Sequence, residues 1–445
     1  MSASGGRNPV LPADVFVPDP EAHVVSDGRL FVYGSLDGPD DEYCSDRYRP
    51  VSTADLREWV VHEPSFHAGH VGWYGEKSTE QAPFAQPQTP FMLKTLRGMG
   101  VRGVADLIWT ALRRKPARAL LYAPDAIEHA GRHYLYFCMT DGSEGVAVAD
   151  RPEGPFGDPV RLPATGIDPA VFTDRDGTSY YYWGQWSAHG VALNEDRRSF
   201  DEGTVVRALL TEQEHHFHEG SSMRRVGDIY YLVYADVERG KPTSLGYATS
   251  SSPLGPFTYR GIIIDNDGSD PGVWNNHGSI EQVNGQWYVF YHRSSRGTRY
   301  HRRLCVEPIQ ILSDGSIPEV PMTSQGAGEP FAVGEVIDAF RACALTGRVR
   351  IAPSDGGDET LSRWARGDTA TFRYVARGEY GGVSLVVDGR ADIEIAVDGV
   401  TVANLRTQGG SVSTRPFRVT GCGEVVVRMR RGRGFRLRSL TLLAR

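Results

Sequence analysis

Five ionisable residues stand at similar positions in a repeated segment of this sequence: Asp19, Asp125, Asp168, Glu219 and His277. Each lies six to nine positions before a glycine that opens a run of aromatic and β-branched residues. Carboxyl groups that lie close together can hold opposite protonation states, so that one donates a proton while another acts as base or nucleophile. Five unrelated turn residues are the alternative, but the shared position favours a common site.

The repeated segment predicts the fold. Its glycines are Gly28, Gly131, Gly177, Gly227 and Gly285, and the last four are 46, 50 and 58 residues apart. Glu219 to Tyr234 is typical of a β-hairpin, with a first strand that carries Glu219, a turn at Gly227 and a second strand. Repeats of this length built from hairpins indicate a propeller. We therefore expect an all-β protein with a five-bladed propeller over residues 8–325, whose innermost strands bring the five residues together at the channel.

The first two repeats are separated by an insertion at about residues 66–121. Apolar residues at helical spacing predict one helix around Thr95 to Lys115, with a basic opposite face. Such a helix can lie on a membrane, but in an acidic protein we expect it to pack on its own domain.

A second domain is expected at residues 331–445. Four segments of alternating apolar and polar residues there, 369–375, 382–387, 391–397 and 424–429, predict a β-sandwich. From Phe331 onward the chain has 18 Arg, no Lys and 12 acidic residues, a net charge of +6, whereas the remainder carries −13. This step in charge indicates two independently built units.

Bulk properties exclude several classes of protein. The net charge of −7 argues against nucleic acid or an anionic membrane as partner. The five cysteines are odd in number and scattered, which predicts free thiols. The first residues lack the apolar core of a signal peptide, so we expect a cytoplasmic protein unless a leader has been removed.

Several carboxylates at a channel mouth with aromatic walls suit cleavage of glycosidic bonds. That reaction needs one protonated carboxyl group as general acid and one carboxylate as base or nucleophile. Trp186 and Trp274 could stack on sugar rings, and His218 is expected at the pocket rim. Pro18 and Pro20 flank Asp19, and we expect them to hold its backbone extended.

These motifs resemble those of glycoside hydrolase family 43 over residues 8–325. Asp19 in Pro-Asp-Pro matches the general base of that family, Asp168 in Ile-Asp-Pro the residue that tunes the acid, and Glu219 in Glu-Gly-Ser-Ser-Met the general acid. The family also has a channel histidine beside calcium or another cation and a substrate-contacting arginine, which match His277 and Arg293. The predicted substrate-binding residues are Asp125, Trp186, His218, Trp274 and Arg293.

The resemblance implies an inverting enzyme that removes arabinofuranosyl or xylosyl residues from oligosaccharides, with no organic cofactor. A galactofuranosidase on the same scaffold and a non-catalytic sugar-binding propeller are the alternatives. Tyr122 departs from the tryptophan that usually stands in Trp-Ala-Pro. The C-terminal unit weakly resembles carbohydrate-binding module family 6.

Overall fold

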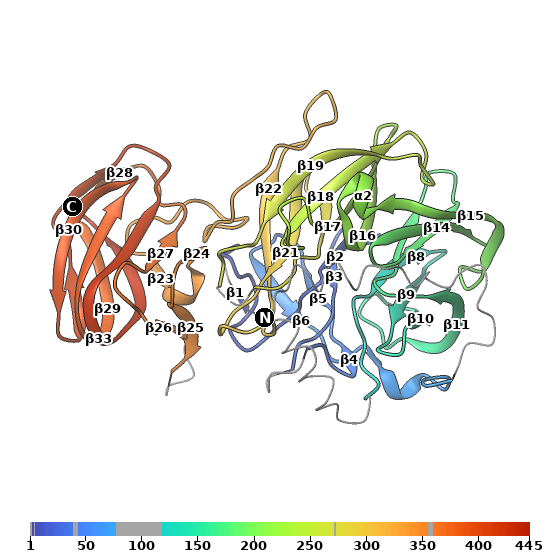
Figure 1. Cartoon of the computed structure of the whole chain (residues 1–445), viewed down its shortest axis with the longest axis horizontal. Coiled ribbons are helices and arrows are strands. Elements are labelled where there is room, and N and C mark those ends of the chain that lie inside the picture. Colours follow the sequence, from blue (N-terminus) through green and yellow to red (C-terminus); the bar gives the residue numbers. More distant parts are fainter. Residues whose placement is uncertain (1, 4, 39–42, 77–117, 271–272, 355–358) are drawn as a thin grey trace.

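The computed structural model describes residues 2–3, 5–38, 43–76, 118–270, 273–354 and 359–445 (Figure 1). A β-propeller occupies one end of the long axis, and a separate β-domain built from the C-terminal residues occupies the other. The predicted helix around Thr95 to Lys115 lies outside the described residues. None of the helices in the described part is long and apolar enough to cross a membrane.

Within the described residues the propeller has five sheets, as predicted, and each sheet is built from one stretch of the chain. The first holds β1 (Ser2–Ala3), β2 (Glu21–Val24), β3 (Leu30–Tyr33), β5 (Val51–Thr53) and β6 (Glu58–Val61). In this first sheet β1 pairs with β6. The second holds β8 (Asp125–His129), β9 (Arg132–Cys138), β10 (Ser143–Ala149) and β11 (Gly157–Thr165). The third holds β12 (Ala170–Thr173), β13 (Ser179–Trp183), β14 (Ser187–Leu193) and β15 (Phe200–Thr211). The fourth holds β16 (Phe217–Val226), β17 (Ile229–Asp236), β18 (Ser244–Ser250) and β19 (Thr258–Asp265), and the fifth β20 (Ser279–Val283), β21 (Gln286–Arg293) and β22 (Arg303–Ile309).

The innermost strands β2, β8, β12, β16 and β20 follow one another around a closed ring, since each contacts the next and β20 contacts β2. The N-terminal segment also joins the fifth blade: the Val10 N–H donates to the Leu304 carbonyl at 3.1 Å, and the Asn8 side chain bonds the backbone of Val306 in both directions. The first residues of the propeller thus lie beside its last strand, which is how the ring closes.

Tight turns and aromatic packing explain why each repeat forms a blade. Gly227 links β16 and β17 with φ of 62°, a left-handed conformation that costs glycine little. Rings on the second strand of one blade pack against the next blade: Tyr136 of β9 lies 5.5 Å from Tyr181 of β13 between ring centroids, inside a buried apolar cluster. The repeated aromatic residues are therefore core.

Short elements complete the propeller domain: β4 (Arg47–Tyr48), which pairs with β7 (Phe66–His67), the 3-10 turn Ala68–His70 and the one-turn helix α2 (Glu212–His215). All five cysteines are free, as predicted.

The C-terminal domain is a nearly closed β-sheet around one apolar core, consistent with the predicted sandwich. Two long strands, β29 (Gly382–Val397) and β33 (Val425–Leu443), pair along most of their length. The other elements are β23 (Val336–Asp338), the 3-10 turn Ala339–Arg341, β24 (Ala344–Leu345), β25 (Arg350–Pro353), β26 (Glu359–Ser362), β27 (Thr369–Phe372), β28 (Gly378–Tyr380), β30 (Val400–Thr407), β31 (Gly410–Ser413) and β32 (Phe417–Val419).

A buried ion pair joins the two domains. The Glu359 carboxylate on β26 accepts from the Arg303 guanidinium of β22 at 2.5 Å and from Arg296 at 2.9 Å. The side chains of Glu359 and Arg303 are 1% and 2% exposed. Removing one partner of such a pair leaves a buried charge uncompensated, which costs far more than losing a surface pair.

Replacing Glu359 by Ala is therefore expected to lower the free energy of unfolding by about 3–5 kcal/mol, measured by urea denaturation. Glu319→Ala is the matched control, because Glu319 pairs with Arg239 at 2.9 Å on the surface and should cost about 1 kcal/mol or less. Equal effects of the two substitutions would contradict the importance of this contact.

Candidate active site

A pocket of about 480 Å³ opens at one mouth of the propeller channel. Asp19, Asp168, Glu219 and His277 line it together, so four of the five repeated residues meet. Each is largely buried, with exposed fractions of 4–6%. Its volume is within the range of small-molecule sites.

Local backbone geometry points these side chains into the channel. Asp19, Asp168 and His277 each stand two residues before the innermost strand of their blade. Asp19 and Asp168 both have φ of 55°, a left-handed conformation that is uncommon outside glycine and is often found at functional sites. The expectation that Pro18 and Pro20 hold Asp19 extended is therefore wrong, because the chain turns at this residue before it enters β2.

Buried donors surround Asp19. Arg302 donates from Nη1 to Asp19 Oδ1 at 2.7 Å, and Ser35 Oγ donates to Oδ2 at 2.6 Å. Burial alone would raise the pKa of Asp19, but Arg302, followed by His277, His292 and Ser35, outweighs it and leaves the pKa below its ordinary value. Asp37 holds Arg302 in turn, accepting at 3.0 Å and 2.9 Å. Asp19 is thus an ionised carboxylate near neutral pH, as a general base must be.

Arg302→Gln is expected to shift the acid limb of the kcat/KM pH profile upward by about one to three pH units. The lowered pKa of Asp19 preserves the base as pH falls, and without the guanidinium Asp19 should take up a proton at higher pH. Arg302→Lys, which keeps a positive charge, should retain most of the original profile.

Arg299→Gln is the control for this pH shift. Arg299 lines the same pocket, and neither the hydrogen bonds nor the ion pairs of the described residues join it to Asp19. An acid limb that moves equally in the Arg299 and Arg302 variants would remove Arg302 from this role.

Glu219 is aimed by an irregularity in β16. The register between β16 and β17 shifts on both sides of Glu219, as in a β-bulge, a feature that often re-aims a side chain at active sites. Gly220, with φ of 73°, allows the His277 ring to lie against the backbone, because a Cβ there would come within 3.0 Å of that ring. Gln185 donates to Glu219 Oε2 at 2.6 Å and Asn275 to Oε1 at 3.3 Å.

Asp168 and His277 lie between the other two carboxylates. His277 Nδ1 is 3.9 Å from Asp19 Oδ1 and 3.7 Å from Asp168 Oδ2. Burial, then the neighbouring Glu219 and Asp19, raise the pKa of Asp168 well above its ordinary value. Burial also lowers the pKa of His277. The site thus combines an ionised carboxylate at Asp19 with a second carboxyl group, at Asp168, whose pKa depends on the charge of Glu219.

The pocket rim is aromatic. It is formed by Tyr43, Tyr122, Trp274, Arg299 and Tyr300. The Tyr43 ring meets those of Tyr122 and Tyr300 edge-on at 6.2 Å and 6.1 Å. Trp274 and His218 are placed at the pocket as the sequence predicts.

Three residues predicted to contact substrate lie elsewhere. Asp125 is the first residue of β8, as Glu21 is of β2, so it lies two residues deeper in the channel than Asp19. The residue of this blade that lines the pocket at the position equivalent to Asp19 is Ala123. The backbone N–H of Trp186 donates to the His218 carbonyl at 2.5 Å, so Trp186 supports the pocket wall without lining it. Arg293 is buried against Glu307 at 3.5 Å and bonds the Thr323 carbonyl.

Three residues that hold the carboxylates of the site were not predicted from the sequence. Gln185 and Asn275 hold Glu219, and Arg302 holds Asp19. Gln185 follows the aromatic run of its blade, and Asn275 lies in the same Trp-Asn-Asn-His segment as His277, so proximity in sequence could have indicated both. Arg302 is 283 residues from Asp19 and has no such signal.

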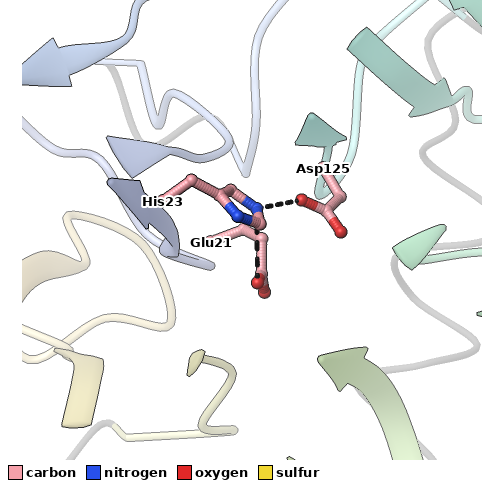
Figure 2. Close-up of side chains that lie close together, drawn as sticks. All are labelled: Glu21, His23 and Asp125. Atoms are coloured by element: carbon pink, nitrogen blue, oxygen red, sulfur yellow. Dashed lines mark hydrogen bonds and ion pairs between the residues drawn. The ribbon is translucent and has the colours of Figure 1, made fainter. Parts of the chain in front are cut away.

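A second cluster lies deeper in the channel (Figure 2). His23 Nε2 is 2.6 Å from Asp125 Oδ1 and 3.6 Å from Glu21 Oε1. Arg224 donates to Glu21 at 2.9 Å and to Glu281 at 3.0 Å. Burial, then Asp125, raises the pKa of Glu21 to about 7, and burial raises that of Asp125 to about 7 as well. These side chains occupy the channel below the site.

Two places in the channel offer donors for a cation. His277 supplies one nitrogen beside two carboxylates, so a calcium ion there, which takes six to eight oxygen ligands, would be held largely through water. Glu21, His23 and Asp125 offer three ligand atoms within 4.8 Å of one another. This mixed set of nitrogen and oxygen ligands suits a transition metal better than calcium. One of the three ligands, the Glu21 carboxylate, is already paired with Arg224.

The fold is a five-bladed propeller whose channel pocket gathers three carboxyl groups and a histidine. The family model for glycosyl hydrolases family 43 matches residues 105–317. A xylosidase/arabinosidase of Thermoclostridium stercorarium is 32% identical over 385 residues, which cover 76% of this chain and 72% of that one. This chain therefore belongs to glycoside hydrolase family 43, and it is an inverting glycoside hydrolase.

Solved structures agree. A family 43 β-xylosidase/α-arabinofuranosidase from a compost microbial metagenome, solved with xylotriose in a calcium-free form, is 26% identical with a TM-score of 0.54; the match covers 72% of this chain and 98% of that one. An arabinoxylan arabinofuranohydrolase of Bacillus subtilis, 23% identical with a TM-score of 0.53, matches all of this chain and 99% of its own. The second likeness shows the fold alone and includes the C-terminal domain.

Proposed function

We propose that this enzyme removes terminal β-xylosyl or α-L-arabinofuranosyl residues from plant-type oligosaccharides. The observation that best supports this proposal is the pocket itself. A buried ionised carboxylate at Asp19 and a second carboxyl group at Glu219 face this pocket from different walls. The relatives named xylosidase/arabinosidase support this sugar class. The channel below the pocket holds the cluster of Glu21, His23 and Asp125, so we expect the pocket to bind the end of a chain rather than its middle.

In the proposed mechanism Asp19 removes a proton from water, and Glu219 donates one to the leaving oxygen. β20 lies between β2 and β16 in the ring, so the two groups come from blades that are not adjacent. Inversion requires about 6.5–9.5 Å between the two carboxyl groups, which leaves room for a water. Asp168 acts on Glu219 through charge, and Gln185 and Asn275 fix its orientation. His218 and Trp274, with the tyrosines of the rim, would contact the sugar.

A panel of nitrophenyl glycosides tests the sugar class. We expect hydrolysis of the β-D-xylopyranoside, the α-L-arabinofuranoside or both, at rates well above that of the β-D-galactofuranoside. Preference for the galactofuranoside would assign the scaffold to the other furanosidase class, and hydrolysis of none would leave the proposed substrate unsupported.

We further propose that a calcium or other divalent cation binds beside His277 on the channel axis. The neutral imidazole and the neighbouring carboxylates favour a positive charge there. Exhaustive chelation is expected to lower the melting temperature, and readdition of calcium should restore it.

The cation site is assigned with two variants. The response to chelation should disappear in His277→Ala and persist in His23→Ala. The reverse pattern would place the ion at Glu21, His23 and Asp125, and no response in the parent protein would contradict bound metal.

A further inference from the structure

The C-terminal domain carries a strongly basic hollow on its sheet. β33 contains six arginines and no acidic residue. A pocket of about 490 Å³ lies where β33 meets β29 and β30. These strands belong to the domain at the left of Figure 1. Four arginines line it, Arg390, Arg406, Arg431 and Arg433, against one carboxylate, Asp392. We call these five residues the arginine pocket; its local charge is +3.

The existing ion pairs organise the arginine pocket and leave part of its charge unbalanced. Asp392 Oδ1 accepts from Arg406 Nε of β30, and Oδ2 accepts from Arg431 Nη2 of β33, each at 2.9 Å. Asp392 therefore holds two guanidiniums from the two flanking strands. Among the described residues, no ion pair or hydrogen bond involves the guanidinium of Arg390 or Arg433.

The strand register places Arg390 and Arg433 directly opposite each other. Like charges at such a cross-strand pair are destabilising. Arginines can keep an exposed sheet edge from aggregating, but β29 and β33 are interior strands that pair on both sides. An anionic ligand between the two guanidiniums would explain the arrangement.

The chemistry of the lining indicates the ligand. Arginine forks match planar carboxylates with two parallel hydrogen bonds. Thr407 and Gln408 add a hydroxyl and an amide suited to sugar hydroxyls, and the lining contains no aromatic ring. A duplex nucleic acid is disfavoured by the overall charge of −7. The geometry points to an acidic polysaccharide: we propose that the arginine pocket binds uronic acid side groups of the chains from which the propeller removes sugars.

This proposal rests on the proposed function for its choice of polysaccharide, but its test measures binding alone. The full-length protein is run through native gels that contain glucuronoxylan or the same glucuronoxylan after chemical reduction of its carboxyl groups. We expect retardation by the acidic polymer, its loss after reduction, and weaker retardation as salt is added. Arg390→Gln/Arg433→Gln should weaken binding by about tenfold or more, since hydrogen bonds to charged groups are the strong ones.

The matched control is Arg415→Gln/Arg418→Gln, which removes two exposed arginines of the same domain outside the arginine pocket. It should bind glucuronoxylan normally, and both double variants should hydrolyse nitrophenyl glycosides at the parent rate. Loss of binding with normal hydrolysis separates this inference from the catalytic proposal. Equal binding of reduced polymer, equal loss in both variants, or no binding by the parent protein would overturn it. If glucuronoxylan does not retard the protein, retardation by duplex DNA or stabilisation of the fold by inorganic phosphate would also overturn it.

Discussion

Asp19→Asn is expected to reduce kcat by about two orders of magnitude or more, the usual worth of a positioned base. Asparagine keeps the size of the side chain and can still meet Ser35 and Arg302, but it cannot take a proton from water. Because the missing step is attack by water, a better leaving group should not restore the rate. Steady-state kinetics with a methyl glycoside and a dinitrophenyl glycoside would measure both effects.

Asp125→Asn is the matched control for this loss. It makes the same substitution at a repeated aspartate that lies two residues deeper and outside the pocket. The folded variant should retain activity within a few-fold of the parent. Comparable losses in the two variants, with unchanged melting temperatures, would deny Asp19 a special role.

Glu219→Gln should cause a loss of similar size on substrates with poor leaving groups, about two orders of magnitude or more. A dinitrophenolate departs with little protonation, so the loss on an activated substrate should be far smaller. The two variants therefore predict opposite patterns: Glu219→Gln is rescued by the leaving group, and Asp19→Asn is not. Rescue of both, or of neither, would contradict the division into acid and base.

Much of the propeller could be predicted from local sequence. A glycine turn followed by an aromatic strand marks each blade, because turn geometry and the packing of rings between blades are local consequences of residue type. Asp19, Asp168, Glu219 and His277 were predicted because they precede or open innermost strands that must meet on the axis. The prediction that Asp125 joins the pocket was wrong, and its spacing already differed from that of the other aspartates. Asp125 stands six residues before its glycine, whereas Asp19 and Asp168 stand nine before theirs.

Contacts between distant segments could not be predicted in this way. Both Arg293 and Arg302 belong to the fifth blade, and nothing local distinguishes the one that reaches Asp19 from the one that pairs with Glu307. The left-handed backbone at Asp19 was hidden for a similar reason, because the tertiary fold overrides the extended preference of a residue before proline. The cross-strand pair of Arg390 and Arg433 likewise depends on a register set by the whole sheet.

Proton NMR of the first sugar released by the parent enzyme tests the single displacement most directly. Attack by a water that Asp19 activates, on the face opposite the group protonated by Glu219, inverts the anomeric carbon. We predict that the first anomer to appear has the configuration opposite to that of the substrate and equilibrates only later by mutarotation. A first product with retained configuration would contradict the roles assigned to Asp19 and Glu219.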